Sequence, residues 1–166
     1  MYDCGGYEQG FAYLKAHATE ITPEFVADLR AVSMDLQTEQ AKPELAAVFA
    51  KLGIVAALLL GRNAEIGMAF YCKGSILMRQ GLYLEAIALL DEALPYLRNA
   101  NDLRQLASSL YDMAICYDKI GNVGSALRLL REVLTYQQDE KDRVDTLAFM
   151  LVLTARSSGD PNELIN

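Results

Sequence analysis

The sequence predicts an all-α fold in which antiparallel helical hairpins stack side by side. Two glycines forty residues apart, Gly81 and Gly121, support this prediction because each lies in a copy of one pattern. The first copy consists of Gly74, Leu77, Gly81, Tyr83, Ala86, Leu90 and Ala93, and the second of Ala114, Tyr117, Gly121, Val123, Ala126, Leu130 and Val133. Self-similarity at a fixed period is typical of repeat architectures. The 52% hydrophobic composition, rich in Ala and Leu, favours helices.

Two helices are expected at the start of the chain. Residues 7–18 can form a short helix with Phe11 and Leu14 on one face. A second helix should begin at Thr22 and Pro23, because Thr is a favoured N-cap and Pro is favoured at the first helical position. Its apolar stripe is expected to be Phe25, Leu29, Val32 and Leu36.

A third helix should run from Pro43 to a stop at Gly61. Its buried side is expected to consist of Leu45, Val48, Phe49, Leu52 and Val55. The most apolar run, residues 52–60, is too short to span a bilayer and is interpreted as part of a buried helix.

The two copies of the pattern predict two complete hairpins and one further helix. Gly81 and Gly121 should end the first helix of each hairpin, and Asp102 should cap the start of the second hairpin. Pro95 should kink or end its helix, since it cannot donate a hydrogen bond to the preceding turn. The single domain is therefore divided into an N-terminal segment 1–21, a degenerate hairpin 22–61, repeats 64–100 and 101–140, and a lone helix 141–159.

These residues resemble the tetratricopeptide repeat. The second-helix motif Ala-x3-Phe-x2-Ala of that family corresponds to Ala86, Leu90 and Ala93, and again to Ala126, Leu130 and Val133. The resemblance is strong over residues 64–138, and the forty-residue period is similar to the longer-repeat subclass of bacterial signalling and adaptor proteins. It implies a right-handed superhelix whose concave groove is lined by the first helix of each repeat.

The resemblance also indicates which side chains line the groove. Residues at repeat positions two, five, nine and twelve are Met68, Tyr71, Ser75 and Met78, then Ser108, Tyr111, Ile115 and Asp118, then Thr146, Phe149, Leu153 and Arg156. Tyr71, Tyr111 and Phe149 would form an aromatic ladder, and aromatic residues are common interface anchors. Arg79 and Lys119 would add cations that select acidic or polar groups on a partner.

Composition excludes several other classes of function. A net charge of −7 and a pI near 4.7 argue against nucleic acid and anionic membrane partners, which call for clustered Lys and Arg. His17 is the single histidine, and Cys4, Cys72 and Cys116 have no metal-ligand spacing, so we expect no metal, cofactor or catalytic residues. Three separated cysteines and a polar N-terminus suit the cytoplasm.

Two functions remain open from the sequence. The first is a non-enzymatic scaffold that binds a protein or peptide segment in the groove, for instance as the sensor or adaptor part of a signalling protein. The alternative is a homo-oligomeric assembly protein that associates through its C-terminal helix, because that helix lacks a partner within the chain. Leu164 and Ile165 could instead cover this helix by folding back.

Overall fold

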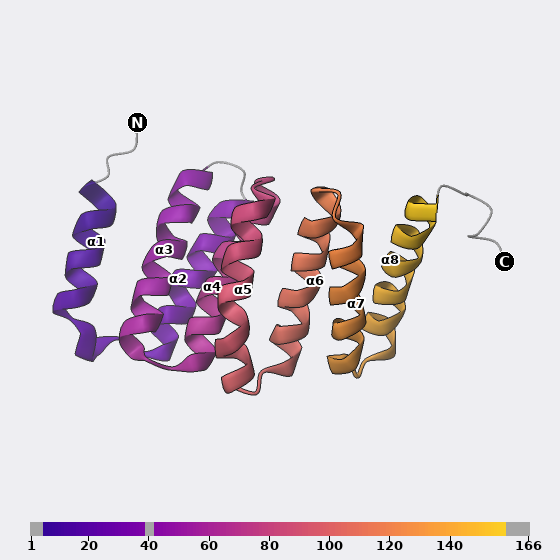
Figure 1. The fold of residues 1–166 in the computed structure, drawn as a ribbon. Helices are drawn as coiled ribbons and strands as arrows, with labels where there is room; N and C mark the ends of the chain where they lie inside the picture. The colour runs from indigo at the N-terminus through magenta and orange to yellow at the C-terminus, as the bar shows by residue number, and fades with distance from the viewer. Residues whose placement is uncertain (1–4, 39–41, 159–166) are drawn as a thin grey trace.

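The computed structural model describes residues 5–38 and 42–158, and every regular element among them is helical. The helices are α1 (Gly5–Ala16), the short 3-10 helix η1 (Ala18–Glu20), α2 (Pro23–Thr38), α3 (Pro43–Leu60), α4 (Asn63–Arg79), α5 (Tyr83–Asn99), α6 (Leu103–Lys119), α7 (Val123–Tyr136) and α8 (Glu140–Ser158). Successive helices alternate in direction and form an elongated stack from α1 to α8 (Figure 1). The predicted all-α stack of hairpins is confirmed.

The turns within the hairpins depend on glycine. Gly81 and Gly121 have φ angles of 79° and 82°, in the left-handed region that costs a glycine little. The next amide along the chain donates to the final turn of the preceding helix in both cases, Leu82 to Leu77 O at 3.0 Å and Asn122 to Tyr117 O at 2.8 Å. This hydrogen bonding satisfies carbonyls that a helix end leaves free.

Small residues allow the helices of each hairpin to approach closely. Ala86, Ala114 and Ala126 have no solvent exposure, and Gly74 is buried against Leu90. The three alanines belong, with Leu90, Leu97, Leu110, Leu130 and Leu153, to one core cluster that extends from α5 to α8. A second cluster, around Leu14, Val26, Ala57 and Ile66, joins α1 to α4.

The buried faces of α2 and α3 differ from the expected ones. In α2 the buried residues are Val26 and Ser33, whereas Phe25 and Val32 are 38% and 40% exposed. In α3 the fully buried residues are all small, namely Ala46, Ala50, Gly53, Ala56 and Ala57. The large residues predicted to be buried in α3 are only partly covered, because α3 packs against its neighbours along its face of small residues.

The helix around Pro95 and the apolar face of α1 can also be compared with the sequence expectations. Pro95 does not end its helix, since α5 continues to Asn99. In α1 Leu14 is buried while Phe11 remains 37% exposed, so the expected apolar face is only partly used.

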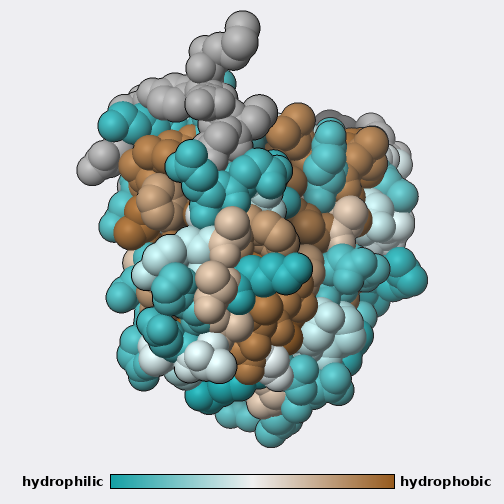
Figure 2. Space-filling model, turned by 90° about the vertical axis from the view of Figure 1, so that its left-hand side faces the viewer, coloured by the Kyte–Doolittle hydropathy of each residue, from teal (hydrophilic) through white to brown (hydrophobic). Residues whose placement is uncertain are grey.

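Helix α3 is, among the described residues, the one helix long and apolar enough to cross a membrane by length and composition. Core helices of soluble proteins pass the same test, and α3 packs against α1, α2 and α4 here. Figure 2 looks onto the N-terminal end of the stack and shows apolar residues gathered over part of it. Large apolar side chains of α1 and α3 are exposed, namely Phe11, Tyr13, Leu58 and Leu59.

Candidate functional site

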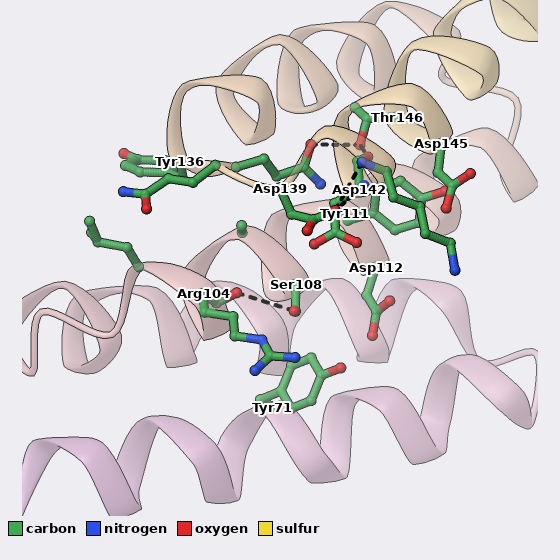
Figure 3. Close-up of a pocket in the computed structure, with 15 residues that line it drawn as sticks. Tyr71, Arg104, Ser108, Tyr111, Asp112, Tyr136, Asp139, Asp142, Asp145 and Thr146 are labelled. Atoms are coloured by element: carbon green, nitrogen blue, oxygen red, sulfur yellow. Dashed lines mark hydrogen bonds between the residues drawn. The ribbon is translucent and has the colours of Figure 1, made fainter.

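A cavity of about 950 Å³ lies where α4, α6, the α7–α8 link and the start of α8 meet. Figure 3 shows side chains from these elements directed toward the same space. The lining residues are Tyr71, Leu103, Arg104, Ala107, Ser108, Tyr111, Asp112, Tyr136, Gln137, Gln138, Asp139, Lys141, Asp142, Asp145 and Thr146.

The α7–α8 link forms one wall because α7 ends early. Gln137 has an extended conformation, with φ −74° and ψ 123°, and turns the chain away from the helix axis. Arg143 Nη1 then donates to the carbonyls of Leu134 and Gln137 at 2.9 and 3.3 Å. The buried Thr146 donates to Gln137 Oε1 at 3.0 Å. These hydrogen bonds hold the link against the first turns of α8.

Two tyrosines from neighbouring first helices line the cavity. Tyr71 projects from α4 and Tyr111 from α6, and both are partly buried. Burial raises the pKa of Tyr71, and the charge of Asp112 raises it further. Burial likewise raises the pKa of Tyr111, with the charges of Asp145 and Asp112 adding to the effect. Both hydroxyls are therefore partly desolvated and lie near carboxylates.

Asp112 connects the two repeats at the inner wall. Ser75 Oγ donates to Asp112 Oδ2 at 2.8 Å, which links α4 to α6. Burial raises the pKa of Asp112, and hydrogen bonds from Ser75 and Tyr71 and the charge of Arg79 partly offset that rise. Asp112 is therefore a desolvated carboxylate that takes part in none of the ion pairs found among the described residues.

A comparison with protein families assigns this part of the chain. The tetratricopeptide repeat model matches residues 65–139, which extend from α4 to the α7–α8 link. This segment belongs to the tetratricopeptide repeat family. Its members generally mediate protein–protein interactions. A search of curated proteins found no match.

The tetratricopeptide repeat pattern brings several of the predicted groove residues to the cavity. Tyr71, Ser108, Tyr111 and Thr146 all line it. The Phe149 ring packs against the Tyr111 ring, with the ring centroids 5.8 Å apart and the ring planes tilted by 57°. Of the predicted aromatic ladder, the described residues show one ring contact, between Tyr111 and Phe149.

Other predicted groove residues have structural partners. Ser75 and Leu153 are 3% and 0% exposed, so their side chains are not accessible to a partner in this structure. Asp118 forms an ion pair with Arg156, which ties α6 to α8. Neither these residues nor Met78, Ile115, Arg79 and Lys119 line the cavity.

Sequence reasoning missed the acidic wall. Asp112, Asp139, Asp142 and Asp145 line the cavity, and none of them is among the groove residues predicted from the sequence. One signal was available, because Asp112 and Asp145 each lie next to a predicted groove position, Tyr111 and Thr146. The position of the link, however, depends on tertiary contacts.

Proposed function

We propose that this chain is a non-enzymatic interaction scaffold that binds an extended segment of a partner protein in the cavity between α4, α6 and α8. The observation that carries the proposal is the placement of Tyr71 and Tyr111 in one cavity of a tetratricopeptide repeat stack. Partly buried rings supply contact area at a small entropic cost. Membership of the family supports a protein partner.

We further propose that the chain is the sensor or adaptor part of a bacterial signalling protein, and that it is located in the cytoplasm. Cys72 and Cys116 are free, buried thiols, and burial raises the pKa of Cys116 to about 11. Unpaired thiols of this kind suit a reducing compartment.

Binding can be tested with peptides selected from a random 12-residue phage-displayed library. Selected peptides should bind the intact chain and lose about 1–3 kcal/mol of binding free energy when Tyr111 is replaced by Ala. Tyr13→Ala is the matched control, because Tyr13 is 60% exposed on α1, outside the cavity. Fluorescence anisotropy gives the affinities, and circular dichroism checks that helicity is retained. Equal binding to the wild type and to Tyr71→Ala/Tyr111→Ala would contradict the proposal.

A second candidate function is homo-oligomeric assembly through α8. Val144, Leu147 and Leu151 are 56%, 50% and 51% exposed. They occur at helical spacing on one side of α8, away from the buried Thr146 and Leu153. Contiguous apolar surface of this kind is typical of interaction sites. Sedimentation of the chain over a concentration range tests this candidate.

A further inference from the structure

The walls of the cavity carry more negative than positive charge. Four lining residues are acidic, Asp112, Asp139, Asp142 and Asp145, and two are basic, Arg104 and Lys141. The acids come from α6, the α7–α8 link and α8, so they face the space from different elements (Figure 3). An excess of one sign of charge in a cleft attracts ligands of the opposite sign.

Of these four carboxylates, those of Asp139 and Asp112 form hydrogen bonds within the described part of the chain, whereas those of Asp142 and Asp145 do not. Asp139 caps α8 by accepting from the amides of Lys141 and Asp142, at 2.9 and 3.3 Å. Asp112 is held by Ser75. The side chains of Asp142 and Asp145 take part in none of the hydrogen bonds or ion pairs found among the described residues. Both are exposed and open to a ligand.

The aromatic wall suits a cation as well. Asp145 lies beside Tyr111 (Figure 3), and the charges of Asp145 and Asp112 both act on the Tyr111 hydroxyl. A cation over a tyrosine face is attracted by the ring, and more strongly where solvent is partly excluded. A metal ion is a poorer fit than an organic cation, because no group of three acidic, His or Cys side chains in the described part of the chain is placed to hold one.

We infer that the segment bound in this cavity carries a Lys or Arg side chain, whose cation lies among Asp112, Asp142 and Asp145 and against the ring of Tyr111. This inference rests on the function proposed above, and it specifies the chemistry of the partner. The long aliphatic stem of Lys or Arg would pack on the tyrosine rings while its charged end reaches the carboxylates. The cations Arg104 and Lys141 belong to the same cavity and would disfavour a second basic residue placed next to them.

The test uses the peptides selected from the random library on the wild-type chain. Lys and Arg should be enriched among them, and replacing the enriched residue by norleucine should weaken binding at least tenfold. The same replacement should cost less than twofold on Asp142→Asn/Asp145→Asn, since the double-mutant cycle isolates the charge contact. Asp91→Asn/Glu92→Gln is the matched control, because it makes the same change in net charge at exposed positions of α5 outside the cavity.

The outcomes separate the two levels of the proposal. Peptides that lose affinity for Tyr71→Ala/Tyr111→Ala but show no basic enrichment, or that bind Asp142→Asn/Asp145→Asn unchanged, would overturn the inference and leave the binding site standing. Selected peptides indifferent to the tyrosines would overturn the proposed function itself. An equal loss of affinity on the α5 control would show long-range attraction only, and would also overturn the inference.

Discussion

Gly74 and Leu90 are in such close contact that a Cβ on Gly74 would lie 2.8 Å from Leu90 Cγ. Leu90 is completely buried, and the carbonyl of Ala86 lies 3.4 Å from the same point, so the contact joins α4 to the following helix α5. Because the surrounding core is packed, a side chain at position 74 must move one of these groups.

Gly74→Ala should lower the free energy of unfolding by about 1–3 kcal/mol, and Gly74→Leu by more, because overpacking forces the two helices apart. Gly124→Ala is the control: Gly124 lies in α7, and nothing is within 4 Å of its added Cβ. That change should be neutral or stabilising by up to about 1 kcal/mol. Urea denaturation measures both, and equal midpoints for Gly74→Ala and the wild type would contradict the proposed contact.

The left-handed turn positions should differ in their response to substitution. Gly121→Ala should destabilise by about 1–2 kcal/mol, since only the backbone conformation opposes the new methyl group. Asn101 occupies the corresponding conformation in the α5–α6 link, with φ 56°. Asn101→Gly should therefore be tolerated or slightly stabilising. Thermal unfolding compares the two variants, and a larger loss for Asn101→Gly than for Gly121→Ala would refute the explanation.

The fold was predictable where local rules determine it. Gly81 and Gly121 specify the turns, and the small residues paired with Leu90 and Leu130 specify the hairpin contacts, so repetition in sequence translates directly into repetition in space. In α2 the stripe of large residues predicted the wrong face. The buried positions there are Val26 and Ser33, and a periodicity of large residues does not detect a contact made by small ones.

The candidate site was predictable only in part. Tyr71 and Tyr111 follow from the repeat positions, and both line the cavity. The acidic wall could not be found in the same way, because Asp142 reaches the cavity only through the bend at Gln137 and the hydrogen bonds of Arg143. Those interactions are specified by tertiary packing of α7 against α8 rather than by any repeat motif.

Asp112 should make the stability of the protein depend on pH. Its pKa is raised in the folded state above the ordinary value of 3.8, mainly by burial. Folding therefore favours its protonated form, and its contribution to stability is full below pH 3.8 and is lost as pH rises through the folded-state pKa. Asp112→Asn keeps an acceptor for Ser75 and removes this titration. Its unfolding free energy relative to the wild type should increase from acidic to neutral pH.

Urea denaturation of both proteins at several pH values gives that difference directly. Asp91→Asn serves as the control, because it removes one carboxylate at an exposed position of α5. A difference between Asp112→Asn and the wild type that stays constant, or that decreases as pH rises, would contradict the assignment of Asp112 as a desolvated carboxylate.

The exposed face of α8 should cause self-association if it is an assembly surface. Leu147 and Leu151 lie one turn apart, and each is about half exposed. The wild-type chain should then sediment above its monomer mass as concentration increases, while Leu147→Glu/Leu151→Glu should stay monomeric because two charges cannot be buried in an apolar contact. Leu84→Glu is the matched control, since Leu84 is 68% exposed on α5.

Leu164 and Ile165, which could instead cover the apolar face of α8, lie outside the described residues. A wild-type monomer at all concentrations, with association appearing only in Leu164→Ser/Ile165→Ser, would assign the cover to the chain's own C-terminus and reject the assembly function.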